Sequence, residues 1–190
     1  MLLLVGLGNP GSNYTNTRHN IGFKIIDAIN AHFKLSKQKP KFKGLLTTGD
    51  INEKKIYAIK PLTFMNNSGT AIKELIDYFK IDAKNVFVFH DDMDIDFGKI
   101  KVKFGGGSAG HNGIESIDKF IGKDYSRVRI GIGHPKKRKK VNSHVLEDFK
   151  DDEEEKINEI SENIVKQLPT LIEKKIDLFS SKVNQDLNGI

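Results

Sequence analysis

The sequence of 190 residues contains no cysteine, which excludes disulfide bonds, a thiolate nucleophile and a cysteine-based metal site. It also contains no apolar run long enough to span a bilayer, no internal repeat and no linker between domains. The first apolar run ends at Gly6, and no basic region precedes it. We therefore expect no signal peptide and a cytoplasmic protein.

Two common arrangements of reactive side chains are missing as well. No serine stands in a Gly-x-Ser-x-Gly turn, which argues against a serine nucleophile. None of the 6 histidines has a histidine partner one helical turn away, as a zinc site on a helix would require. Together with the lack of cysteine, this spacing predicts that the protein has no metal site.

Charge of neither sign dominates. The 31 basic residues outnumber the 25 acidic ones, and the net charge of +6 favours a polyanionic partner. The basic run Lys136–Lys140 is predicted to be a solvated surface loop that adds non-specific attraction to nucleic acid. Hydrophobic residues make up 37% of the chain, enough to bury a core, and the length predicts one domain over residues 1–190.

Apolar periodicity predicts strands that alternate with helices. The predicted strands cover residues 2–5, 45–51, 55–59, 86–89, 99–104 and 128–132, and the predicted helices cover 21–33, 68–79, 114–120 and 151–179. This order predicts a single α/β domain whose mixed, twisted sheet is flanked by helices.

Local signals refine these boundaries. Asn67 or Ser68 is expected to cap the second helix, and residues 34–43 are expected to form a basic connector. The last helix is expected to begin at Asp151 with a capping pair to Glu154, and Pro169 is expected to break or kink it. Residues 180–190 are expected to be frayed.

Polar side chains follow two of the predicted strands. The first strand leads into a polar loop that contains His19, and the strand 86–89 leads into His90, Asp91 and Asp92. Histidine can take a proton from water near neutral pH when a carboxylate orients its ring. His19 is therefore the first candidate for a general base, with Asp91 or Asp92 as its partner, while His90 and His111 are rival bases by the same criterion.

Three further loops carry asparagine: Asn9, Asn66 and Asn112. Their neutral amides can hold a peptide group or a water molecule, and can donate hydrogen bonds to a developing oxyanion. Each of them could also be a local turn former, but three in similar positions favour a site. His111, in a glycine-flanked loop, is a further candidate for ligand contact.

Two motifs suggest other functions. Gly6, Gly8 and Gly11 match the dinucleotide fingerprint of a nicotinamide oxidoreductase, but Pro10 and the late start of the helix argue against it, so we interpret these glycines as turn formers. Lys101 and Lys103 share one strand face, which indicates either a phosphate clamp or, more often, a solvated face. The basic balance leaves an RNA-binding module without catalysis as the second alternative.

Four stretches together are more specific than any single motif. They read VGLGNPGSNYTNTRHNIGF, KPLTFMNNSGTAI, FHDDMDIDFGKIKVKFGGGSAGHNG and RVRIGIGHP. In order and spacing they closely resemble bacterial peptidyl-tRNA hydrolase. The resemblance implies a monomeric α/β enzyme that cleaves the ester between a peptide and the 3′-terminal ribose of tRNA, without metal or cofactor.

The resemblance also implies roles for individual residues. His19 matches the catalytic base, Asp91 the carboxylate that supports it, and Asn9 the residue that senses the blocked amino group of the substrate, expected here to accept a hydrogen bond from the peptide N–H. Lys101 and Lys103 match positions that grip tRNA phosphate, joined by one of two arginines, Arg127 or Arg129. The positions that match contacts to the peptidyl end are Tyr14, Phe64, Met65, Asn66 and Asn112.

Overall fold

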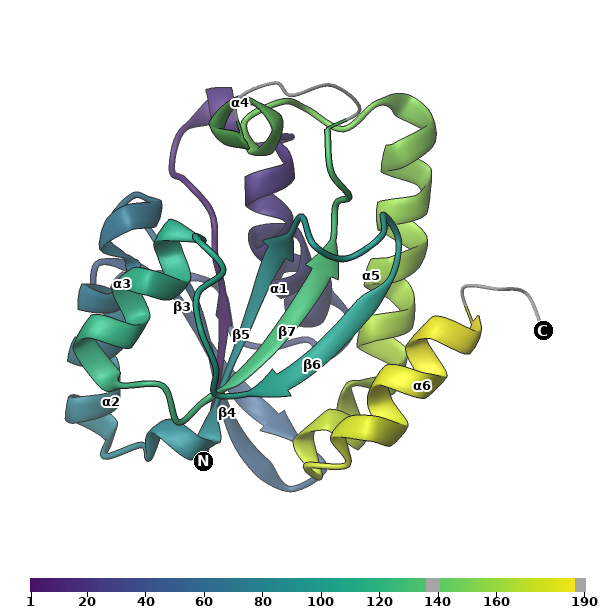
Figure 1. Cartoon of the computed structure of the whole chain (residues 1–190). Coiled ribbons are helices and arrows are strands. Elements are labelled where there is room, and N and C mark those ends of the chain that lie inside the picture. Colours follow the sequence, from purple (N-terminus) through teal and green to yellow (C-terminus); the bar gives the residue numbers. More distant parts are fainter. Residues whose placement is uncertain (136–140, 187–190) are drawn as a thin grey trace.

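The computed structural model describes residues 1–135 and 141–186, so the predicted surface run Lys136–Lys140 lies outside the described residues. Within this part of the chain, seven strands form one sheet in the order β2-β3-β4-β1-β5-β7-β6 (Figure 1). The strands are β1 (Leu2–Gly6), β2 (Lys39–Lys41), β3 (Gly44–Ile51), β4 (Lys54–Pro61), β5 (Val86–Asp92), β6 (Ile100–Phe104) and β7 (Ser126–Gly131).

The sheet is mixed, as predicted. Strand β1 pairs in parallel with β4 and β5, and β5 pairs in parallel with β7. The remaining pairs, β2 with β3, β3 with β4 and β6 with β7, are antiparallel. Because the carboxyl ends of parallel strands meet at one edge of a sheet, the segments that follow β1, β4, β5 and β7 gather there.

Helices cover both faces of the sheet (Figure 1). Alternate residues of β1 point to opposite faces, so Leu2 and Leu4 pack in one core and Leu3 and Val5 in the other. The first core is closed by α1 (Ile21–His32), α5 (Asp151–Ile172) and α6 (Ile176–Asp186), and the second by α2 (Ser68–Phe79) and α3 (Asn112–Ile121). The short helix α4 (Val141–Val145) lies beyond the carboxyl edge of the sheet.

Close packing of α1 against the sheet depends on glycine. A Cβ atom on Gly22 would overlap the main chain of Leu7 and Phe89, and one on Gly6 would overlap the main chain of Gly22. Gly8 lies in the same way against the ring of Phe23. The interpretation of Gly6 and Gly8 as turn formers is therefore wrong: they allow the close approach that places the start of α1 over the ends of β1 and β5.

The C-terminal helices differ from the prediction in three ways. The cap of α5 lies one residue earlier, since the main-chain N–H of Lys150 donates to Glu153 Oε2 at 2.9 Å. Pro169 does not end the helix, which continues for three more residues to Ile172. Residues 180–186 are not frayed: they complete α6, which buries Val183.

Other local expectations also need correction. The connector 34–43 contains the short strand β2, and β5 extends through Asp92. Neither Asn67 nor Ser68 caps α2 with its side chain, because Ser68 Oγ donates to the carbonyl oxygen of Met65 instead. Phe104 and Phe120, the last residues of the predicted strand 99–104 and helix 114–120, are 48% and 43% exposed.

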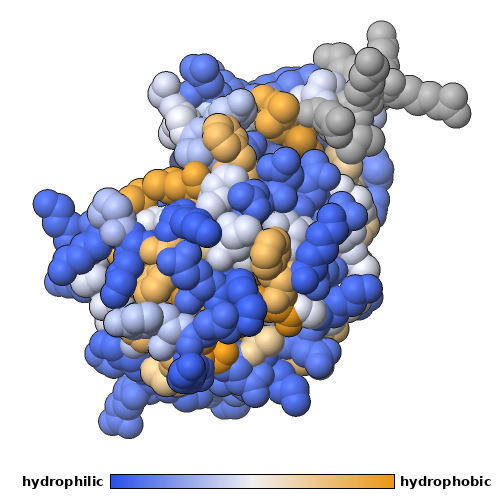
Figure 2. All heavy atoms as spheres, turned by 90° about the vertical axis from the view of Figure 1, so that its left-hand side faces the viewer, coloured by the Kyte–Doolittle hydropathy of each residue, from blue (hydrophilic) through white to orange (hydrophobic). Residues whose placement is uncertain are grey.

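The side of the molecule formed by α2 and α3 is mostly hydrophilic, with hydrophobic side chains in separate patches (Figure 2). Among the described residues, no helix combines the length and the apolar character needed to cross a membrane.

Candidate active site

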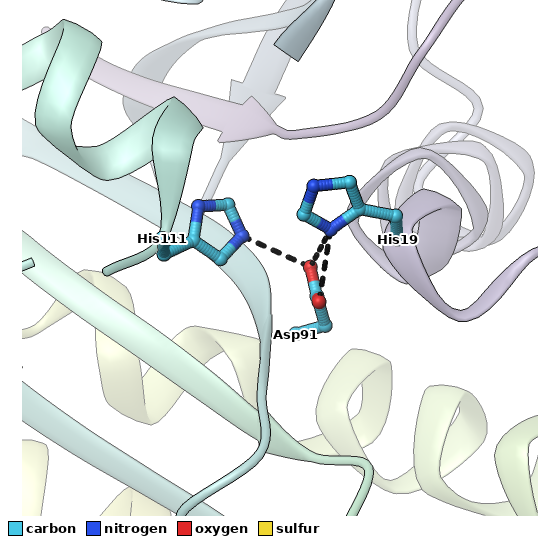
Figure 3. Close-up of side chains that lie close together, drawn as sticks. All are labelled: His19, Asp91 and His111. Carbon is cyan, nitrogen blue, oxygen red and sulfur yellow. Dashed lines mark hydrogen bonds and ion pairs between the residues drawn. The ribbon is translucent and has the colours of Figure 1, made fainter. Parts of the chain in front are cut away.

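Three segments bring polar side chains together at the carboxyl edge of the sheet. The loop after β1 ends in a 3₁₀ turn, Arg18–Asn20, that contains His19. Strand β5 carries Asp91 near its end, and His111 directly precedes α3. Residues far apart in the sequence thus meet, with the Asp91 carboxylate lying between the two histidine rings (Figure 3).

His19 is held by Asp91. Its Nδ1 lies 2.8 Å from Asp91 Oδ1 and 2.9 Å from Oδ2, and both residues are buried. Because an ionised carboxylate only accepts, Nδ1 carries the proton and Nε2 keeps its lone pair. Among the described residues Nε2 has no hydrogen-bond partner. The other candidate partner, Asp92, instead accepts from Arg129 Nε at 2.7 Å.

His111 faces Asp91 with its other ring nitrogen, Nε2 rather than Nδ1. Its Nδ1 accepts from the main-chain N–H groups of Gly113 and Ile114, as the cap of α3, and its Nε2 lies 3.0 Å from Asp91 Oδ1. The single proton of the ring is therefore on Nε2 and is donated to Asp91. No lone pair of His111 is left to take a proton from water, so its contacts suit the support of Asp91 rather than the rival role of base.

His90 is also unsuited to be a base. It is buried, its Nδ1 donates to the main-chain oxygen of Asp91 at 2.8 Å, and its Nε2 has no partner within the described chain. Burial, together with the neighbouring His111, lowers the pKa of His90 to about 3. The ring stays neutral at neutral pH and holds a proton poorly.

The carboxyl group of Asp91 is kept ionised by its neighbours. Burial alone would raise its pKa, but the attraction and hydrogen bonds of His19 and His111 outweigh burial and hold the pKa well below its usual range. The negative charge of Asp91 can therefore stabilise the positive charge that His19 gains when it takes a proton.

The same three residues form a cluster of possible metal ligands. The facing atoms of His19, Asp91 and His111 lie within 4.8 Å of one another. A metal ion needs a lone pair from each histidine nitrogen, so its binding would displace the protons from both nitrogens that face Asp91. Moving the His111 proton to Nδ1 would point it at two main-chain N–H donors. The residues do not fit a metal ion.

Beside His19 lies a hollow of about 390 Å³, which we call the amide hollow. Asn9 Oδ1 accepts from the main-chain N–H of Met65 at 2.8 Å, and Asn20 holds the main chain of Asn9 through two hydrogen bonds of 2.9 Å. The NH₂ group of Asn9 is therefore open to a ligand, and Oδ1 keeps one lone pair for the peptide N–H from which it is expected to accept. The lining residues are Asn9, His19, Phe64, Met65, Asn66, Asn112, Val145 and Leu146.

The other predicted contact residues surround this hollow. Asn66 and Asn112 are exposed in its wall, and Met65 is buried beneath it. Phe64 is 53% exposed with a φ of 57°, a region that favours glycine. Tyr14 is outside the wall, but its ring meets that of Phe64 edge-on, with the ring centroids 6.4 Å apart.

A second hollow of about 300 Å³, the basic hollow, lies between β6, β7 and the glycine loop. Lys103 is in its wall, whereas Lys101 is exposed on the same strand outside it. Arg127 is committed to Gly107 O and Asp118, while Arg129 uses only Nε, toward Asp92. The geometry therefore favours Arg129. The lining residues are His90, Asp92, Lys103, Gly107, Ser108, Ala109, Ile114, Arg127 and Arg129.

A third hollow of about 200 Å³, the central hollow, connects the other two. It shares His19 and Val145 with the amide hollow, and Asp92 and Ser108 with the basic hollow. His19 thus stands between a neutral and a cationic end. The lining residues are His19, Asp91, Asp92, Met93, Asp94, Ser108, Ala109, Gly110, His111, Asn112 and Val145.

Sequence reasoning missed several residues of this edge. Asn20, which holds Asn9, directly follows His19, and that adjacency was the available signal. Val145 and Leu146 supply apolar wall, and their only signal was an apolar pair between polar neighbours.

Known proteins of one family are similar to this chain in both sequence and fold. The sequence model of the peptidyl-tRNA hydrolase family matches residues 3–189. The chain is 68% identical to the peptidyl-tRNA hydrolase of Pelagibacter ubique, over 97% of this chain and 99% of that protein. The crystal structure of peptidyl-tRNA hydrolase from Acinetobacter baumannii superposes with a TM-score of 0.90 at 33% identity, over 97% of this chain and 94% of that one. The chain therefore belongs to the peptidyl-tRNA hydrolase family.

Proposed function

We propose that this chain hydrolyses peptidyl-tRNA at the ester that joins the peptide to the 3′-terminal ribose. Membership of the family supports the reaction and the substrate. The observation that carries the chemistry is the state of His19, whose Nδ1 is held by Asp91 while its Nε2 is open between two hollows.

The proposed mechanism uses His19 as a general base. Its Nε2 takes a proton from a water molecule, the resulting hydroxide attacks the ester carbonyl carbon, and Asp91 stabilises the protonated ring. The amide groups of Asn66 and Asn112 donate to the oxyanion of the tetrahedral intermediate. As the intermediate collapses, the ester C–O bond breaks and the His19 proton passes to the departing ribose oxygen.

The three hollows divide the substrate by its charge. The neutral amide hollow suits the peptide, and the central hollow suits the terminal nucleoside. In the basic hollow, Lys103 and Arg129 suit a phosphate of the tRNA, with Lys101 adding attraction from the same strand. The ester then falls beside His19, where the amide and central hollows meet.

Asn9 supports discrimination against aminoacyl-tRNA whose amino group is free. Its NH₂ group can donate to the carbonyl oxygen of the peptide bond, or of the acyl group, that blocks the α-nitrogen. A free aminoacyl-tRNA lacks that carbonyl and places an ammonium group near the same donor. The unpaired donor and the repulsion both disfavour this substrate.

The proposed site residues meet at one edge of a single sheet, which supports a single domain, and we propose that this domain acts as a monomer. Because its proposed substrate is tRNA, we place the activity in the cytoplasm.

The test is release of tRNA from N-acetylaminoacyl-tRNA, with unblocked aminoacyl-tRNA as the control substrate. We expect turnover of the blocked substrate alone, and a fall in kcat of about 10²–10⁴-fold in His19→Ala. Circular dichroism would check that the variant is folded. Turnover that persists in His19→Ala would move the base elsewhere, and tRNA binding without turnover by the parent would favour an RNA-binding module.

A further inference from the structure

A fourth hollow, which the mechanism does not use, lies on the other side of Asn9. It has a volume of about 480 Å³, within the range of small-molecule sites, and we call it the Lys60 hollow. Asn9 lines both this hollow and the amide hollow, so the two are neighbours. The lining residues are Asn9, Pro10, Gly11, Ser12, Thr15, Asn20, Phe23, Lys24, Asp27, Leu45, Lys60 and Leu62.

Lys60 is the unusual residue of this hollow. Its side chain is only 10% exposed, and its Nζ lies 2.5 Å from Asp27 Oδ1 and 5.7 Å from the centroid of the Phe23 ring. An ammonium group has three N–H donors, and among the described residues only Asp27 accepts from Lys60. Burying a lysine whose N–H donors are unpaired costs free energy, unless a ligand or a water molecule accepts from them.

The charges of the hollow indicate a neutral ligand. Lys60 is paired with Asp27, and Lys24 is paired with Glu154, so no positive charge is left uncompensated. The Asp27 carboxylate would repel a phosphate. Phe23, Leu45 and Leu62 add apolar wall. The tRNA phosphates already have the basic hollow at the opposite end of the site, which leaves a neutral, carbonyl-bearing chain as the fitting occupant.

The wall of the amide hollow contains a strained residue next to the partner of Asn9. Phe64 adopts φ 57° and ψ 158°, which is costly for a residue with a side chain. This conformation accompanies the exposed position of its ring, edge-on to Tyr14, while the next residue, Met65, donates its N–H to Asn9. Strained residues of this kind are concentrated at ligand-binding sites.

We infer that the Lys60 hollow is a second peptide subsite, which takes the residues upstream of the esterified one. The Lys60 ammonium group donates to a main-chain carbonyl oxygen of the peptide. This contact tolerates any sequence, because every residue offers the same carbonyl. The inference rests on the proposed function, and it predicts that longer peptides bind better.

The test compares two substrates that share the same last residue, N-acetylaminoacyl-tRNA and N-acetyltetrapeptidyl-tRNA with uncharged side chains. For the parent, we expect kcat/KM to be about tenfold higher for the longer peptide, because a hydrogen bond to a charged donor is worth about that factor. In Lys60→Met this ratio should fall toward one, through a change in KM. The Asp27 carboxylate remains half exposed to solvent in this variant and still accepts from Gln38. Ser12→Phe, an exposed position, should lower the ratio by filling the hollow.

The matched control is Lys55→Met. Lys55 lies at the other end of β4 and pairs with Asp50 at the surface, so the variant loses the same charge and should keep the parent ratio. A parent ratio near one, or a tenfold ratio that survives in both Lys60→Met and Ser12→Phe, overturns the second subsite alone. Failure of the parent to hydrolyse N-acetylaminoacyl-tRNA overturns the proposed function and the subsite with it.

Discussion

The amide hollow and the basic hollow lie along the same edge of the sheet but are built differently. The amide hollow presents the uncharged side chains of Asn9, Asn66 and Asn112, which come from the loop after β1, the 3₁₀ turn before α2 and the start of α3. The basic hollow presents Lys103 and Arg129 from two neighbouring strands. The difference teaches how one site can separate the two parts of the proposed substrate: neutral amides suit the peptide, and cationic groups suit the phosphate.

The two hollows also differ in how firmly their side chains are held. The side-chain oxygen of Asn9 accepts from the Met65 N–H, and the main chain of Asn9 exchanges two hydrogen bonds with the Asn20 side chain. The orientation of the Asn9 NH₂ group is therefore fixed. Lys103 has no ion-pair partner among the described residues and folds over Gly106, where a Cβ would lie 2.9 Å from Lys103 Cε. The amide hollow is therefore suited to orienting its ligand, whereas the basic hollow is suited to attracting an anion over a longer range.

The largest effect is expected when charge is placed in the amide hollow. Asn9→Asp keeps the acceptor for the Met65 N–H but replaces the NH₂ donor with a carboxylate oxygen. We expect kcat/KM for N-acetylaminoacyl-tRNA to fall about a hundredfold, because the carbonyl of the acyl group then faces a negative charge. Turnover of unblocked aminoacyl-tRNA should fall less, since its ammonium group can pair with Asp. An equal fall for both substrates would contradict the role given to Asn9.

A smaller effect is expected when charge is removed from the basic hollow. Lys103→Met and Arg129→Gln should each raise KM about tenfold and leave kcat unchanged. Each should also reduce the slope of log KM against log salt by about one. The control is Lys84→Met, an exposed lysine near the start of β5 at the opposite edge of the sheet, which should change neither value. Salt-independent KM in the parent would show that the hollow does not grip phosphate.

The smallest effect concerns His90, beneath the basic hollow. Its pKa is 6.5 when unperturbed and about 3 in the folded chain. Between these values the unfolded chain binds a proton that the folded chain does not, so the free energy of unfolding falls as the pH falls through this window. His90→Gln should reduce the loss of stability between about pH 7 and about pH 5, measured by urea unfolding. An unchanged pH dependence would mean that His90 is not held neutral.

Much of this fold could be predicted because burial leaves a periodic signature. The apolar stretch at Val86–Phe89 and the alternation around Lys101 both mark real strands. Strand β2 (Lys39–Lys41) leaves no such signature, because all three residues are exposed and its main chain pairs with β3 without burying an apolar side chain. The helical end of α6 was missed for a similar reason, since it buries few side chains.

Part of the site could likewise be predicted from the sequence, and part of it could not. Polar residues at strand ends pointed to His19 and Asp91, because parallel strands bring their ends together. The part played by His111 depends on which ring nitrogen faces the start of α3, and that is a matter of orientation rather than residue type. The choice between Arg127 and Arg129 likewise depends on partners that are distant in the sequence.

The two hydrogen bonds between Asn20 and Asn9 have a consequence for redesign of the enzyme. Because Asn20 is the next residue after His19, the turn that carries the proposed base also holds Asn9, the residue proposed to read the peptide. Changes on that turn would alter selectivity and rate together. An engineer who wishes to widen the substrate range should begin elsewhere in the wall of the amide hollow, at Leu146, which has no part in these hydrogen bonds or in the proposed chemistry.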